Sequence, residues 1–254
     1  MADRCLPYTS LRAGAELRLF CLPYAGGGAS LYRDWPDELP EWVDVRPVQL
    51  PGRENRADEP ALTSIDALAE RLADELTPHL DDTPFALFGH SMGALLAYEL
   101  AARLEARSER TGPIALLVAG HRPPHLPDHL APLYDLPDKE FLAGVFALDG
   151  TSDELLAEPE VVQALLPLLR ADFTAVDTYV HRLTEAVRCP VTVFTASADP
   201  TVIPGQMSRW SDVTERPPRV RTLPGGHFFV TTHRSLVTGM VATELHRALR
   251  AVRA

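Results

Sequence analysis

Short apolar runs alternate with helical patterns along most of the chain. Between the runs, apolar residues at helical spacing predict helices over Ser64–Leu80, Ala94–Leu104 and Leu236–Val252, the first with a capping-box-like start at Thr63 and Asp66. This alternation predicts an α/β fold with a mostly parallel central sheet flanked by helices on both faces. The runs that predict strands are bounded by Pro, Gly and Asp: Leu17–Leu22, Val43–Leu50, Phe85–Phe88, Ile114–Ala119, Val191–Ala196 and Val220–Leu223.

The pattern changes between Arg122 and Arg188, where no run predicts a strand. Proline-rich chain is followed there by apolar helical segments over Lys139–Leu148 and Pro159–Leu183. Because a compact sheet domain rarely needs so long a connection, we expect a helical lid subdomain, the alternative being an ordinary helical pair that caps the sheet. The predicted organisation is a core of residues 1–121 and 189–254, with a helical lid subdomain of residues 122–188 inserted between strands.

The amino-acid composition and charge argue against several classes of function. The chain of 254 residues has 24 Lys and Arg against 35 Asp and Glu, a net charge of −11 that argues against binding nucleic acid through phosphate contacts. Its 3 cysteines form no CxxC pair, so neither a disulfide framework nor a zinc site is indicated. Without a signal peptide or a membrane-spanning apolar run, a soluble cytoplasmic protein is expected. Lys139 is the only lysine and is not part of a Walker phosphate loop.

One motif indicates catalytic chemistry. Gly89-His90-Ser91-Met92-Gly93 directly follows a predicted strand and precedes a helix. This G-x-S-x-G pattern in a strand, tight turn and helix is typical of the nucleophile elbow of α/β-hydrolases. The glycines allow strand and helix to approach without a side-chain collision, and the serine adopts a strained backbone conformation. An inert serine in a glycine-rich turn is the alternative.

A serine hydroxyl needs a histidine base that is oriented by a carboxylate. In this fold the partners follow the serine in the order acid, then histidine. Asp199 and His227 each come just after a predicted strand, so they should lie at the same edge of the sheet as Ser91. Asp212 and His233 fit less well, because each lies in or near a helical pattern. Asp199 could instead be an Asp-Pro turn residue and His227 a loop histidine.

The oxyanion formed on attack needs backbone N–H donors, one from the residue after the serine and one from the loop after an early strand. Met92 supplies the first. The glycine-rich loop after Leu17–Leu22 should supply the second, from Ala25 or, as second choice, Tyr24. A dinucleotide-binding turn would need G-x-G-x-x-G spacing, which this loop lacks.

Three histidines at four-residue spacing, His121, His125 and His129, would line up as metal ligands on a helix. Pro123, Pro124 and Pro127 forbid that helix. We therefore predict neither a metal site nor a bound cofactor.

The motifs together resemble the stand-alone type II thioesterases of polyketide and nonribosomal peptide assembly lines. GxSxG alone indicates only the α/β-hydrolase superfamily, whereas the Pro51–Glu54 loop and the Leu169–Phe173 segment are more specific. Small departures occur at Ala29-Ser30 and at Ala198. The segments that carry the resemblance are Phe20–Gly27, Leu50–Glu54 with Arg56, Gly89–Ala94, Leu166–Phe173 with Tyr179, Asp199-Pro200 and Gly225–Phe229.

The resemblance implies a hydrolase that removes stalled or aberrant acyl groups from the phosphopantetheine arm of acyl or peptidyl carrier proteins, beneath a helical lid. The chain has no carrier segment of its own, so the substrate should arrive in trans. Because carrier proteins are usually acidic, docking would need a positive patch, for which Arg53, Arg56, Arg170 and Arg182 are candidates. The rival functions are an esterase or lipase acting on oxygen esters and a non-catalytic binding module.

Overall fold

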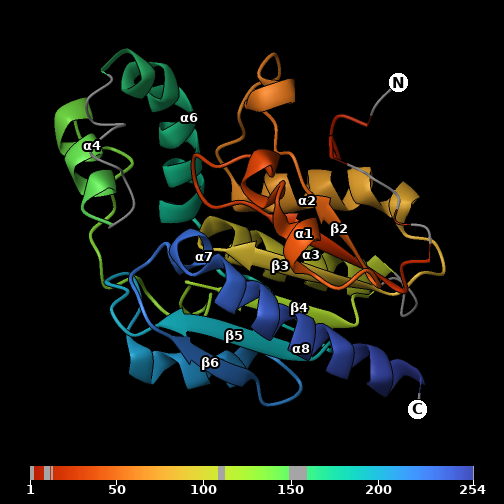
Figure 1. Cartoon of the computed structure of the whole chain (residues 1–254). Helices are drawn as coiled ribbons and strands as arrows, with labels where there is room; N and C mark the ends of the chain where they lie inside the picture. Colours follow the sequence, from red (N-terminus) through yellow and green to blue (C-terminus); the bar gives the residue numbers. More distant parts are fainter. Residues whose placement is uncertain (1–2, 9–11, 13, 108–111, 149–158, 254) are drawn as a thin grey trace.

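The central element is a sheet of six parallel strands in the order β2-β1-β3-β4-β5-β6 (Figure 1). A computed structural model describes residues 3–8, 12, 14–107, 112–148 and 159–253. The predicted mostly parallel sheet is thus confirmed. The strands are β1 (Leu17–Leu22), β2 (Val43–Pro47), β3 (Phe85–His90), β4 (Ala115–Ala119), β5 (Val191–Ala196) and β6 (Arg219–Leu223).

Four strands differ in length from the prediction: β4 begins one residue later and β6 one residue earlier, and hydrogen bonding explains the larger differences in β2 and β3. β3 continues to His90 because Gly89 and His90 still pair with β4. β2 ends at Pro47, since the chain turns away and the Gln49 N–H donates to the Cys5 carbonyl at 2.8 Å. The elbow therefore begins inside a strand that the apolar pattern alone ended too early.

Helices cover both faces of the sheet. α2 (Ile65–Leu76) and α3 (Met92–Arg107) pack on one face, while α1 (Trp35–Glu38), α7 (Phe229–Thr232) and α8 (Arg234–Arg253) pack on the other. Successive strand side chains point to opposite faces of the sheet. Leu87 of β3 therefore packs in the core beneath α2 and α3, and Phe88 in the core beneath α1, α7 and α8. Short 3₁₀ segments lie at η1 (Ala29–Tyr32), η2 (Glu54–Arg56), η3 (Thr77–His79) and η4 (Pro204–Val213).

The start of α2 corrects one detail of the sequence analysis. The predicted cap at Thr63 with Asp66 is wrong, because Ser64 is the N-cap and its hydroxyl accepts from the Ala67 N–H at 3.4 Å. The helix proper ends at Leu76, and η3 completes the predicted segment.

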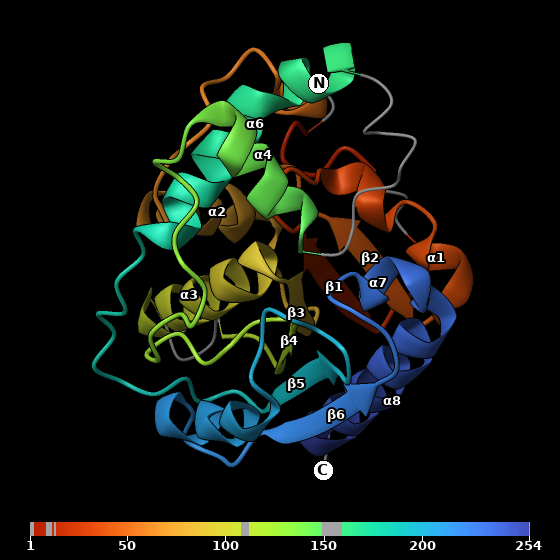
Figure 2. The same ribbon diagram turned by 90° about the vertical axis from the view of Figure 1, so that its left-hand side faces the viewer.

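The segment between β4 and β5 contains α4 (Asp138–Phe146) and α6 (Pro159–Asp177). Both views of the molecule show these helices side by side at the edge of the sheet where the strands end (Figures 1 and 2). Phe141 and Phe173 join them through an edge-to-face contact with ring centroids 5.4 Å apart. Residues 149–158 of the predicted lid lie outside the described residues. The division into core and lid domains stays a prediction.

The parallel arrangement determines where functional side chains can gather. The loops after β1, β3, β4, β5 and β6 all leave the sheet at its carboxyl edge, where the segment with α4 and α6 also lies. In the described part of the chain, no helix is long and apolar enough to cross a membrane.

Candidate active site

Ser91 occupies a sharp turn between β3 and α3, with a positive φ of 55°. Its N–H donates to the Ala119 carbonyl of β4 at 2.8 Å, which fixes the turn against the sheet. A Cβ at Gly89 would overlap the Gly93 carbonyl, and a Cβ at Gly93 would overlap the Leu22 carbonyl of β1. Only glycines at both positions allow strand, turn and helix to pack this closely.

Asp199 and His227 are brought together from the loops after β5 and β6. The His227 Nδ1 lies 3.0 Å and 3.1 Å from the two carboxylate oxygens of Asp199, and both side chains are buried. Burial raises the pKa of the Asp199 carboxyl, but hydrogen bonds from His227 and Thr201 outweigh it and leave the pKa below its usual value. An ionised carboxylate can only accept, so Nδ1 carries the proton and Nε2 is left with a lone pair.

Thr201 is a member of this arrangement that sequence reasoning missed. Its hydroxyl lies 2.7 Å from Asp199 Oδ1 and 2.9 Å from His227 Nδ1, and its N–H also donates to Asp199 Oδ1 at 2.9 Å. The available signal was its place two residues after an Asp in a predicted turn, where an Asx-type hydrogen bond is expected.

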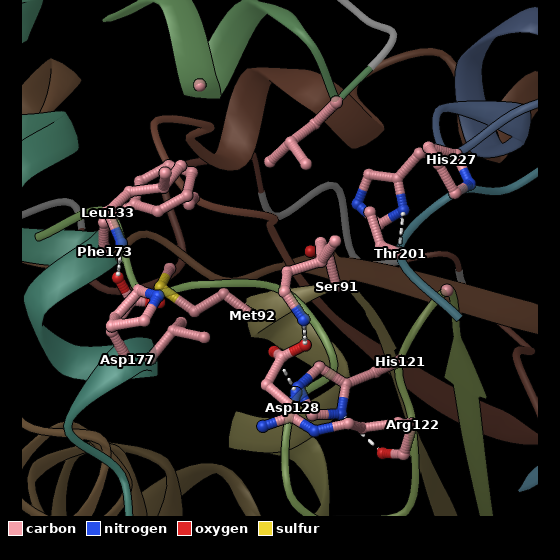
Figure 3. Close-up of a pocket in the computed structure, with 18 of the residues that line it drawn as sticks. Ser91, Met92, His121, Arg122, Asp128, Leu133, Phe173, Asp177, Thr201 and His227 are labelled. Carbon is pink, nitrogen blue, oxygen red and sulfur yellow. Dashed lines mark hydrogen bonds and ion pairs between the residues drawn. The ribbon is translucent and has the colours of Figure 1, made fainter. Parts of the chain in front are cut away.

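Ser91, Thr201 and His227 line one pocket with a volume of about 530 Å³ (Figure 3). Most of the remaining wall is apolar and comes from the segment between β4 and β5. In the described part of the chain, no direct hydrogen bond joins Ser91 to His227; such contacts commonly tighten only when substrate binds. The apolar wall residues are Ala25, Met92, Leu130, Ala131, Pro132, Leu133, Ala147, Leu148, Phe173, Val176 and Pro200.

Two residues that line this pocket have unpaired backbone donors. Neither the Ala25 N–H nor the Met92 N–H donates to any described residue. Met92 is the first residue of α3, so no residue of that helix can accept from it. Tyr24, the second choice for an oxyanion donor, is not among the residues that line the pocket; its ring packs against His90 and Phe228. Among the described residues, the pocket that Ser91 lines is thus also lined by two residues whose N–H groups have no acceptor.

His90, the second residue of the motif, supports the histidine of the pair. It is fully buried, and its Nε2 donates to the His227 carbonyl at 2.8 Å. Burial and the neighbouring His227 lower the pKa of His90 to about 3, so its ring is neutral at physiological pH. This bond holds the backbone of the loop that carries His227.

Four polar residues line the pocket: His121, Arg122 and Asp128 lie together, and Asp177 lies apart from them, beside Leu133 and Phe173 (Figure 3). His121 Nδ1 donates to the Arg122 carbonyl at 2.6 Å, and burial lowers the pKa of His121 to about 3. Arg122 pairs with Asp128 at 2.8 Å, while Asp177 accepts from the N–H of Leu133 at 2.7 Å. Asp177 thereby fastens the chain before α4 to the end of α6.

The other two histidines of the four-residue series point elsewhere. His125 pairs with Asp212 at 3.2 Å, and His129 lies 3.1 Å from the Pro200 carbonyl. Asp212, the alternative acid, is on η4 and is held by Arg209 at 2.7 Å. His233, the alternative base, follows α7 and lies behind Gly225 rather than in the pocket.

The predicted positive patch is wrong for two of its arginines. Arg53 and Arg56 are only 4% and 2% exposed, and both are paired with carboxylates. Arg170 is half-buried, pairs with Asp138 at 2.6 Å and stacks on Phe141. The acidic partner of Arg53 lies 119 residues away along the chain, so the sequence around it did not mark this arginine as buried, whereas Arg56 pairs partly with Glu59, three residues further on.

Comparison with known proteins gives concordant matches. A family model described as a thioesterase domain matches residues 17–248. The gramicidin S biosynthesis protein GrsT of Aneurinibacillus migulanus is 39% identical over 87% of this chain and 86% of its own length. The RedJ thioesterase of prodiginine biosynthesis in Streptomyces coelicolor is 40% identical, with a TM-score of 0.85 over 92% of this chain and 87% of that one. The type II thioesterase BorB of the borrelidin cluster is 36% identical, with a TM-score of 0.83 over 95% and 97% of the two chains.

Proposed function

Because the chain belongs to the thioesterase domain family and is a hydrolase of thioesters, we propose that it releases acyl groups from the phosphopantetheine arm of acyl or peptidyl carrier proteins. The carrier would arrive in trans, as part of a polyketide or nonribosomal peptide assembly line, and the reaction would serve to edit it. One observation carries the proposal: Ser91, His227 and two unpaired backbone donors line a single, mostly apolar pocket.

In the proposed acylation step, His227 Nε2 takes the hydroxyl proton as Ser91 Oγ attacks the thioester carbonyl. Asp199 stabilises the imidazolium that forms, and Thr201 holds Asp199 in place. The carbonyl oxygen, now negative, is bound by the N–H groups of Ala25 and Met92. The C–S bond then breaks, and the pantetheine thiol leaves with the proton from His227. Little acid assistance is needed, because a thiolate is a good leaving group.

Deacylation repeats these roles with water. His227 takes a proton from a water molecule that attacks the acyl-Ser91 carbonyl, and the same two amides bind the second oxyanion. Collapse of the intermediate releases the carboxylic acid and returns the proton to Ser91. The apolar wall contributed by α4, α6 and the chain before them is suited to an acyl chain, which is desolvated on binding. No cofactor of the enzyme itself takes part in this proposal.

The test uses one carrier protein loaded in turn with acetyl, octanoyl and aminoacyl groups. Mass spectrometry before and after incubation should show loss of the acyl mass from the intact carrier. Rapid quenching should reveal a peptide containing acylated Ser91. Ser91→Ala and His227→Ala should each lower kcat by at least about 10³-fold, because the members of such a triad act as a unit.

Other outcomes would redirect the assignment. Faster turnover of soluble oxygen esters than of acyl-pantetheine would indicate an esterase. Unchanged turnover in Ser91→Ala would exclude Ser91 as the nucleophile. Binding of acylated carrier without any loss of acyl mass would indicate a non-catalytic module.

A further inference from the structure

A buried ion pair joins two side chains that take no part in the proposed chemistry. Arg53, in the loop after β2, donates from Nη1 and Nη2 to the two carboxylate oxygens of Asp172 on α6, at 2.7 Å and 2.8 Å. Asp172 is 0% exposed and Arg53 4% exposed. A bidentate ion pair of this kind fixes the orientation of both groups, and burial protects the pair from screening by salt.

The same carboxylate reaches the glycine-rich loop after β1. The Gly26 N–H donates to Asp172 Oδ2 at 2.7 Å, and Arg53 Nη1 donates to the Gly27 carbonyl at 3.1 Å. Each side of the pair therefore bonds to the backbone of that loop. Gly26 directly follows Ala25, which lines the pocket and whose N–H donates to no described residue.

Steric contacts restrict the loop further. Gly26 has a φ of 78°, and a Cβ there would lie 2.6 Å from Leu169 Cδ2 on α6. The loop is thus enclosed between α6 and the Arg53 loop, with its peptide planes set by hydrogen bonds to charged groups. Because the Ala25 carbonyl and the Gly26 N–H share one peptide plane, the bond to Asp172 restricts rotation next to the Ala25 N–H.

We propose that the Arg53–Asp172 pair positions the Ala25 N–H for the oxyanion, and so makes the oxyanion hole dependent on the placement of α6. This inference rests on the proposed acyl-Ser91 mechanism. Asp172 and Arg53 are positioning residues, because neither lines the pocket. If α6 were displaced, the Gly26 N–H would lose its acceptor and the Ala25 donor its orientation. Efficient acylation would then require α6 to be in the position seen here.

A purely structural role makes a different prediction. Removing one partner of a buried ion pair leaves an unpaired charge and destabilises the fold, whereas replacing both by apolar residues is often neutral. Asp172→Leu, which removes both carboxylate oxygens, should therefore lower Tm, but the double variant Arg53→Met with Asp172→Leu should restore much of it. The double variant still leaves the Gly26 N–H without an acceptor. Stability and oxyanion binding are thereby separated.

The experiment compares wild type, Asp172→Leu, the double variant and Arg56→Gln on octanoyl-pantetheine. Arg56 is the matched control, because it is also a buried arginine and lies three residues after Arg53. It pairs with Glu59 and Glu75 and not with the glycine-rich loop. For each protein, Tm, kcat, KM and the inhibition constant of a pantetheine trifluoromethyl ketone are measured. That inhibitor forms a tetrahedral adduct with serine and thus reports on oxyanion binding.

Complete loss of one oxyanion donor lowers kcat by about 10²–10³-fold, so a misplaced donor should lower it by about 10- to 100-fold. We expect this loss in Asp172→Leu and in the double variant, with KM within about threefold and inhibitor affinity weakened by a factor similar to kcat. Arg56→Gln should lose Tm but keep kcat within about threefold of wild type.

Recovery of kcat together with Tm in the double variant would overturn the inference, as would a lowered kcat with unchanged inhibitor affinity. A failure of the underlying mechanism looks different: wild type would then leave octanoyl-pantetheine intact, or Ser91→Ala would remain active. If wild type is active and Ser91→Ala inactive while Asp172→Leu matches wild type, only the positioning role is refuted.

Discussion

Replacing Thr201 by Val tests the part of the site that the sequence did not reveal. The two side chains have nearly the same shape, so the substitution removes a hydroxyl and leaves the packing in place. Asp199 then loses its 2.7 Å donor, and His227 Nδ1 loses its 2.9 Å contact. The Thr201 N–H and His227 remain as donors to the carboxylate.

The size of the effect follows from burial and charge. A hydrogen bond to a charged group contributes about 1.5–3 kcal/mol, and the Asp199 side chain is 0% exposed, so water cannot replace the lost donor. We expect the free energy of unfolding to fall by about 2 kcal/mol. Asp199 is ionised both before and during attack, so most of that loss is common to the ground and transition states. The Thr201 hydroxyl affects kcat only through the stabilisation that increases as His227 becomes charged in the transition state. For its removal we expect about a tenfold decrease in kcat.

Urea denaturation measures the first quantity, and release of free thiol from octanoyl-pantetheine measures the second. Thr201→Ser is the matched control, because it keeps the hydroxyl and loses only a methyl group. We expect Thr201→Ser to keep kcat within about threefold of wild type.

Equal losses of kcat in the Ser and Val variants would refute the reasoning, since the methyl group and not the hydroxyl would then be responsible. A Val variant as stable and active as wild type would show that the Thr201 hydroxyl contributes nothing to the Asp199–His227 pair.

Three further changes test other features. Asp199→Asn should lower kcat by about 10⁴-fold with little change in KM, because an amide neither stabilises the imidazolium nor fixes the tautomer of His227; a loss below tenfold in steady-state kinetics would exclude that role. Ser91→Gly should have a free energy of unfolding about 1 kcal/mol higher than that of Ser91→Ala, since φ at this position is 55°, and should therefore unfold at a higher urea concentration. Equal midpoints would mean that the turn stores no strain. His121, with a pKa of about 3 when folded and about 6.5 when unfolded, binds an extra proton only on unfolding between these values, so wild-type stability should fall as pH falls from 6 to 4. His121→Asn should reduce that slope by about 1 kcal/mol per pH unit in urea titrations, and parallel slopes would refute buried neutrality.

The pattern of apolar runs predicted the sheet well because parallel strands are buried on both faces and therefore read as continuous apolar segments. β1 and β5 have the predicted bounds. The ends of β2 and β3 were missed, because hydrogen bonds to Cys5 and to β4 decide them and apolar character does not. Local capping was misjudged by one residue at Ser64 for the same reason.

The candidate site was predictable where a residue follows a strand end, because topology then brings Ser91, Asp199 and His227 to one edge of the sheet. It was not predictable where contacts cross long stretches of chain. Asp172 lies 119 residues from Arg53, so no local pattern marked Arg53 as buried. His121 was treated only as part of a metal-like series, although it lines the pocket.

The contact between Gly93 and the Leu22 carbonyl has a consequence for altering this protein. The main chain of α3 rests directly on the end of β1, without any side chain between them. The distance between the segments that carry Met92 and Ala25 is therefore set by peptide geometry and is insensitive to rotamer changes nearby. An engineer could rebuild the apolar wall for a different acyl group while this spacing stayed constant, provided that Gly89 and Gly93 were left unchanged.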